Sequence, residues 1–163
     1  MILGMSPLLF IHVALSLIAI AAGLVVLYGL LAGKPHGGWT AVFLATTALT
    51  SITGFPLPAT QLLPSHIVGA LSLALLAVAT AALYIFHLAG AWRWIYVASA
   101  LTALYFNVFV GVVQSFQKLA FLKALAPTQS EAPFLIVQVL VLALFIGLGI
   151  VAAKRFRPLA RGG

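Results

Sequence analysis

Five long apolar runs constrain the fold of this chain more than any other feature of its sequence. They cover about residues 8–31, 39–55, 65–89, 94–114 and 133–153. A helix needs about 20 apolar residues to cross the hydrocarbon layer of a membrane, and the runs are close to that length. Only 6% of the residues are charged, whereas about a quarter are charged in a soluble domain, so the chain has too few polar groups to cover a water-facing surface.

We therefore predict an all-α, polytopic transmembrane helical bundle that forms one integral membrane domain over residues 1–163. Five spans are expected, and a four-span core with one extra helix is the alternative because the second run is short. The first run lacks the basic flank of a signal peptide and is too long for one, so we expect it to be retained as a helix.

The basic residues between the runs predict the orientation. With five spans, Lys34, Arg93 and the four bases near the C-terminus share one side, whereas Lys118 and Lys123 share the other side with Glu131. Cytoplasmic loops are enriched in Lys and Arg, so the N-terminus is expected outside and the C-terminus in the cytoplasm. The bases form no stripe with interleaved aromatic residues, which argues against nucleic acid as a partner.

The near absence of acidic residues and the complete absence of Cys exclude several kinds of chemistry. Glu131 is the only acid, so glycosidases with paired carboxylates and Mg²⁺ or Ca²⁺ sites built from carboxylates are excluded. Without Cys there is no thiol nucleophile or thiolate metal site. A hydrolase or transferase is therefore not expected. The segment from Thr128 to Glu131 fits a capping box that opens the fifth helix.

Polar side chains inside the runs are few. Thr46, Thr50 and Thr53 recur at a spacing that places them on one face of the second helix. Asn107 falls near the middle of the fourth run and needs a partner there, for which a Thr of the second run is suitable. Helix–helix contacts are the expected role of these groups. A polar pocket that also includes Gln114 is the alternative.

The four histidines sort into two pairs, one near each membrane face. His12 and His66 lie near the starts of the first and third runs, and His36 and His87 lie near the ends of the same runs. If the third run is one continuous helix, His66 and His87 are about 60° apart around it and about 31 Å apart along it. Two imidazoles from facing helices satisfy a six-coordinate b-type haem.

A haem also needs basic groups near its propionates. Lys34 and Arg93 lie on the side of His36 and His87, and Lys118 and Lys123 lie on the side of His12 and His66. Purely interfacial histidines, or a Zn or Cu site, are the alternatives. No metal is expected beyond a possible haem iron, because the two pairs are too far apart to supply three or four ligands together.

Two resemblances accompany this pattern. The histidine arrangement resembles the diheme cytochrome b561 type, which implies haem b and transmembrane electron transfer; that family spreads its ligands over four helices, whereas here the second and fourth runs carry no His. The first third of the chain, with Ile11-His12, the stretch 19–23 and the stretch 34–38, is similar to the opening of small uncharacterised bacterial membrane proteins. That similarity implies a bacterial inner membrane and no assigned activity.

Three functional hypotheses remain open from the sequence. The first is a haem-binding electron-transfer protein of the membrane. The second is a non-catalytic accessory or assembly subunit of a larger membrane complex, or a homo-oligomer. The third is a small-solute or lipid-binding transporter that uses Asn107, Gln114 and the Thr residues.

Overall fold

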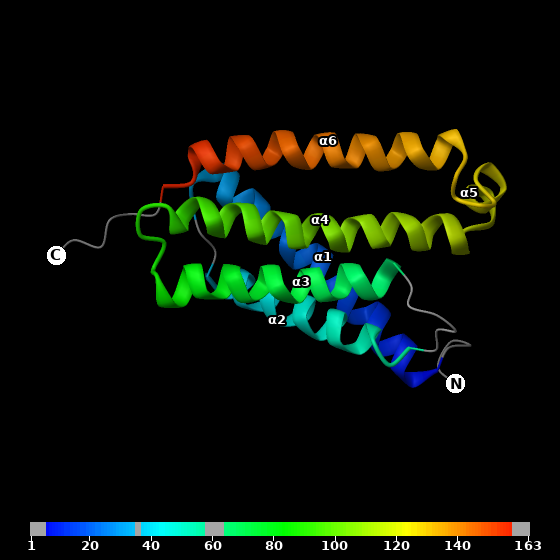
Figure 1. Cartoon of the computed structure of the whole chain (residues 1–163), viewed down its shortest axis with the longest axis horizontal. Coiled ribbons are helices and arrows are strands. Elements are labelled where there is room, and N and C mark those ends of the chain that lie inside the picture. Colours follow the sequence, from blue (N-terminus) through cyan, green and yellow to red (C-terminus); the bar gives the residue numbers. More distant parts are fainter. Residues whose placement is uncertain (1–5, 35–36, 58–63, 158–163) are drawn as a thin grey trace.

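The computed structural model describes residues 6–34, 37–57 and 64–157, and these residues form helices joined by short turns (Figure 1). The prediction of an all-α bundle is confirmed. The elements in chain order are α1 (Pro7–Ala32), α2 (Gly37–Gly54), α3 (Pro64–Thr80), the π-helical turn η1 (Ala81–Ile85), α4 (Trp92–Lys118), α5 (Ala120–Leu125) and α6 (Ala132–Arg155).

Four of these helical segments are long and apolar enough to cross a membrane, by length and composition. They are Pro7–Ala32, His66–Ile85, Trp92–Lys118 and Ala132–Arg155. The protein is therefore a helical membrane protein with four candidate spans. The helix α2 is not among them, since its 18 residues include six Thr or Ser and three Gly, which lower its hydropathy.

The helix α2 nevertheless runs back along α1 for most of the length of the bundle (Figure 1). The imidazole Nδ1 of His12, near the start of α1, lies 3.1 Å from the hydroxyl of Thr53, near the end of α2. Five helices (α1, α2, α3, α4 and α6) thus lie side by side and alternate in direction.

The alternation gives the bundle two ends that differ in charge. We call one the histidine end, where α1 and α3 begin and α2 and α4 finish, and the other the basic end. In the described residues, the histidine end carries Lys118, Lys123 and Glu131, and the basic end carries Lys34, Arg93, Lys154, Arg155 and Arg157. The sorting of bases expected from the sequence is therefore present along the bundle axis.

Local sequence explains where α1 begins and ends. The Ser6 hydroxyl accepts a hydrogen bond from the backbone N–H of Leu9, and Pro7 follows at the first helical position, where its missing N–H has no consequence. Gly33 ends the helix at φ +68°, a left-handed conformation that glycine adopts without strain. The N–H of Lys34 then bonds the carbonyl of Gly29 at 2.9 Å, which satisfies a carbonyl of the last turn.

The core lies where α1 meets α2 and α4 through small residues. Ala19, Ala22 and Gly23 are fully or almost fully buried. A Cβ placed on Gly23 would lie 2.4 Å from the Cδ1 of Leu104 and 3.0 Å from the ring of Phe43. These small residues thus bring three helices into direct contact.

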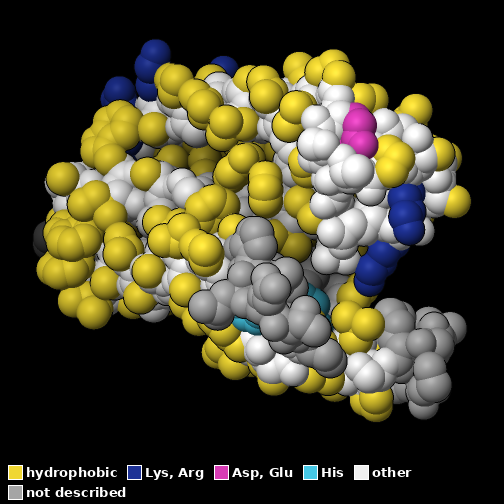
Figure 2. Space-filling view, turned by 45° about the vertical axis from the view of Figure 1, so that its right-hand side comes forward, with side chains coloured by type: hydrophobic (Ala, Val, Ile, Leu, Met, Phe, Trp, Pro, Cys, Tyr) yellow, Lys and Arg dark blue, Asp and Glu magenta, His cyan; other side chains and the backbone are white. Residues whose placement is uncertain are grey.

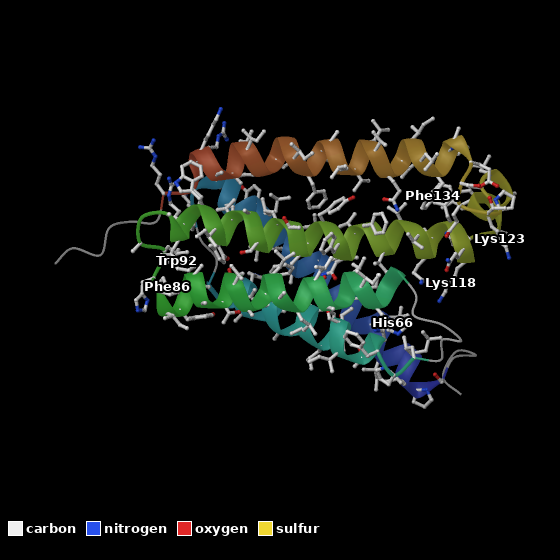
Figure 3. All side chains as sticks on the ribbon, viewed as in Figure 1. His66, Phe86, Trp92, Lys118, Lys123 and Phe134 are labelled. Carbon is white, nitrogen blue, oxygen red and sulfur yellow. The ribbon has the colours of Figure 1, made fainter. Side chains whose placement is uncertain are left out.

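The third span ends earlier than predicted, and the predicted helical position of His87 is wrong. The α-helix gives way to the π-helical turn at Ala81 and ends at Ile85, and His87 has φ +48° in the turn beyond it. The indole of Trp92 stacks on the ring of Phe86, with centroids 3.7 Å apart, which fixes the turn into α4 (Figure 3). The expected 60° relation between His66 and His87 therefore does not apply, because π-helical geometry changes the residue angle and His87 has left the helix.

The fourth helix is longer than the predicted span and continues to Lys118, after which α5 forms a separate short helix. A capping box at Thr128–Glu131 is the predicted start of the last helix. Only half of it forms. The Glu131 carboxylate accepts a hydrogen bond from the backbone N–H of Thr128 at 3.1 Å, but the helix starts later, at Ala132, with Glu131 itself at the N-cap position.

These hydrogen bonds govern the ionisation of the single acid. Desolvation tends to raise the pKa of Glu131, but hydrogen bonds from the Thr128 hydroxyl and from the N–H groups of Thr128 and Ser130 outweigh it and hold the pKa below its ordinary value. A carboxyl whose pKa is lower in the folded state stabilises the fold above its unfolded pKa. That stabilisation disappears as the pH falls through the folded pKa.

We expect Thr128→Val to raise the pKa of Glu131 toward its ordinary value, because the substitution removes the hydroxyl donor. Because Glu131 is the only acidic residue, a carbon-13 glutamate label in the protein reports its titration without overlap. Thr102→Val is the control, since Thr102 bonds its own helix at Ala98 and is remote from the loop. Equal titration midpoints in wild type and Thr128→Val would contradict the prediction.

Candidate functional site

The histidine end brings together groups from four helices. His12 lies in the second turn of α1, and its Nδ1 contacts the Thr53 hydroxyl of α2 at 3.1 Å. Thr53 in turn bonds the carbonyl of Leu49 at 2.8 Å within its own helix. His12 is half-buried between these helices. The histidine is thus held in a fixed position rather than lying freely at the membrane surface.

The Thr53 contact engages Nδ1 of His12 and leaves Nε2 outside this hydrogen bond. A hydroxyl has one hydrogen, and that of Thr53 is directed to helix carbonyls. When the Thr53 hydroxyl donates to one of these carbonyls, it accepts from the Nδ1–H of His12. The neutral imidazole then carries its lone pair on Nε2, which is available to a metal ion or to a hydrogen-bond donor.

Gly54 makes room for this imidazole. A Cβ on Gly54 would lie 3.3 Å from the Cε1 of His12, closer than most Cβ contacts. The next residue, Phe55, lies with its ring centroid 5.8 Å from that of His66, which is in the first turn of α3. The end of α2 thus contacts both histidines, His12 through Thr53 and Gly54 and His66 through Phe55.

Lys118 brings a positive charge to this group. It is exposed in the last turn of α4 and extends toward the level of His66 (Figure 3). Lys123 is exposed on α5, further from the histidines. Figure 2 shows histidine atoms, basic side chains and the single acid on the same face of the molecule.

The second predicted pair is not assembled in the described residues. His36 lies outside them, and His87 is exposed in the turn before α4. Lys34 is also exposed. The guanidinium of Arg93 is engaged elsewhere: its Nη1 donates to the carbonyls of Ala153, at 3.2 Å, and Phe156. This arginine therefore ties the start of α4 to the end of α6.

Most of the predicted polar side chains within the helices form hydrogen bonds to their own helix or to a neighbouring helix. The amide of Asn107 donates to the hydroxyl of Thr47 at 3.0 Å, so the expected bond between the fourth and second runs is present. The hydroxyl of Thr46 bonds the carbonyl of Val42 at 2.7 Å. Thr50 is buried, and its hydroxyl oxygen is among the buried side-chain atoms that lack a hydrogen-bond partner. Gln114 is exposed near the end of α4 and does not join these contacts.

Gly54 and Phe55 were not predicted as neighbours of the histidines. The only sequence feature that pointed to them was their position just before the Pro56 that ends the second run. Within residues 6–34, 37–57 and 64–157, no group of three or more His or acidic residues is placed to hold a metal ion. The described residues could therefore supply at most two imidazoles to a metal at the histidine end. The other ligands would have to come from a cofactor, as they do for haem iron.

No protein-family model matches the chain, and comparisons with curated proteins and with solved structures give no match either. The resemblance to diheme cytochromes and the similarity to small bacterial membrane proteins therefore stay predictions.

Proposed function

We propose that this membrane protein binds one b-type haem at its histidine end, through His12 and His66, and transfers electrons there. The observation that carries the proposal is the contact of His12, whose Nδ1 is held by the Thr53 hydroxyl so that Nε2 is left for iron. Ligating histidines in metal proteins are commonly fixed in this way by a partner on the other ring nitrogen. When bound, the haem supplies a one-electron couple.

The residues around the two imidazoles suit such a group. Gly54 leaves space beside His12 that any larger residue would fill, and Phe55 provides an aromatic contact at His66. Lys118, exposed in the last turn of α4, offers a positive charge for a propionate. The only acid, Glu131, points its carboxylate into its own loop and so adds no negative charge beside the histidines.

The proposal covers one haem rather than two. His87 has no helical position from which to face a partner, and Arg93 is bonded to the end of α6. We also propose that five helices cross the membrane, with the histidine end outside the cell and the basic end in the cytoplasm. The return of α2 to the level of His12 and the excess of bases at the other end support this arrangement.

The test is the visible spectrum of the purified protein, oxidised and then reduced, after expression with a haem precursor. We expect a reduced α-band in the wild type and its loss in both His12→Ala and His66→Ala. His87→Ala is the matched control, because it removes an exposed histidine of the same chain, and it should leave the spectrum unchanged.

A colourless, metal-free protein under these conditions would refute the haem proposal. The second candidate function, that of a non-catalytic subunit of a larger membrane complex, would then be favoured by the exposure of α6. Only Gln138 and Ala152 of that helix are buried, and large apolar side chains point outward along its whole length. The transporter hypothesis has less support, because the Asn107 amide is already bonded to Thr47.

A further inference from the structure

A groove lies between α4 and α6, well away from the histidine end. It has a volume of about 500 Å³ and an almost entirely apolar lining. Its shape comes from small residues: Ala98 on α4 and Gly149 and Ala153 on α6 leave a hollow between larger neighbours. The Cβ that Gly149 lacks would lie 3.8 Å from Leu101, so a larger side chain there would enter the groove.

The groove has the length of one membrane leaflet. On α4 it extends from Trp94 to Phe106, which is 12 residues, or about 18 Å at 1.5 Å per residue. Half of the hydrocarbon layer is about 15 Å. At the far end the ring of Tyr105 meets that of Phe145, with centroids 5.7 Å apart. The groove therefore runs from the basic end to about the middle of the bilayer.

Basic groups stand at its open end. The guanidinium of Arg93 lies 4.2 Å from the ring centroid of Trp94 and bonds the carbonyl of Ala153, and these two residues line opposite walls. Arg93 keeps further N–H donors beyond those two carbonyl contacts. Ile150 of α6 also lines the groove. Lys154 is four positions further along and therefore lies on the same side of this helix.

We propose that this groove is a binding site for an anionic phospholipid, with one acyl chain between α4 and α6 and the phosphate near Arg93 and Lys154. Acyl chains alone give no preference, because surrounding lipid offers the same apolar contact. The preference comes from the headgroup charge. The basic groups at the groove mouth are complementary to a phosphate, and each base near a membrane surface contributes about a fivefold preference.

A second copy of the chain fits this groove less well. In a two-fold dimer whose axis runs along the membrane normal, the same ends meet, so Lys154 and Arg93 of one copy would face the same bases of the other. Like charges at close range oppose such contact. A phospholipid brings the opposite charge to the same place.

The test compares two lipids with the same palmitoyl and oleoyl chains, phosphatidylglycerol and phosphatidylcholine, bound to the full-length protein and counted by native mass spectrometry. We expect phosphatidylglycerol to bind at least about fivefold more tightly. Gly149→Leu should abolish the tight site, because its side chain fills the groove. Gly147→Leu is the matched control, since a Cβ at Gly147 meets no atom within 4 Å.

The charge is tested separately. Lys154→Gln should reduce the preference for phosphatidylglycerol by about fivefold, whereas Lys34→Gln, at the same end but outside the groove, should not. Equal binding of the two lipids would overturn the proposal, as would an unchanged tight site in Gly149→Leu. A dimer that dissociates in Gly149→Leu would show that a second copy occupies the groove instead. None of these outcomes depends on haem.

Discussion

Gly23→Leu is expected to destabilise the bundle by about 3 kcal/mol, the upper part of the range for inserting groups into a packed core. The substitution places atoms where Leu104 and Phe43 already lie, and both of those side chains are 1% exposed. Neither has free space to move into. Because α1, α2 and α4 meet at this point, the new side chain would separate three helices at once.

The measurement is reversible unfolding in detergent micelles, followed by circular dichroism. Gly147→Leu makes the same chemical change in α6, where nothing lies within 4 Å of the added Cβ, so it shares any gain in helix propensity without the clash. We expect it to be neutral or slightly stabilising. Equal stability of the two variants would contradict the packing described for Gly23.

Arg93→Ala is expected to cost about 3 kcal/mol of stability and to loosen the end of α6. Its guanidinium bonds the carbonyls of Ala153 and Phe156, which lie where a helix end leaves carbonyls without partners in the helix. Hydrogen bonds to charged groups contribute about 1.5–3 kcal/mol each. A cation near a helix C-terminus also interacts favourably with the helix dipole.

Hydrogen exchange of the last turn of α6, together with the unfolding measurement, tests this prediction. Arg93→Lys retains the charge but not the planar set of donors, and we expect it to recover only part of the lost stability. Arg157→Ala is the control, because Arg157 is exposed at the same end. If Arg157→Ala has the same effect as Arg93→Ala, net charge rather than the α4–α6 contact is responsible.

Several features of the fold could be predicted from the sequence because they depend on local composition. The long apolar runs predicted membrane helices, and the first run, about residues 8–31, matches α1 (Pro7–Ala32) to within one residue at each end. The bases between the runs predicted the two differently charged ends. The need of Asn107 for a Thr partner in the second run followed from the rule that buried amides are hydrogen-bonded.

Other features could not be predicted because they depend on contacts between distant residues. Nothing in the sequence around His87 indicates the π-helical turn, which is completed by the stacking of Phe86 on Trp92 across the loop. The role of Arg93 depends on the end of α6, which is about 60 residues further along the chain. From the sequence, Arg93 was only a basic residue in a short loop, and it indicated only which side of the membrane that loop lies on.

The sequence by itself determined that this protein is helical and lies in a membrane, and which chemistry its scarce acids exclude, since hydrophobicity and charge are properties of each residue wherever it is placed. Only the tertiary structure decided the contact of His12 with Thr53, the space that Gly54 leaves beside it, and the groove that Gly149 opens toward Arg93. A proton position or a cavity is fixed by which side chains meet, and packing of the helices selects those neighbours.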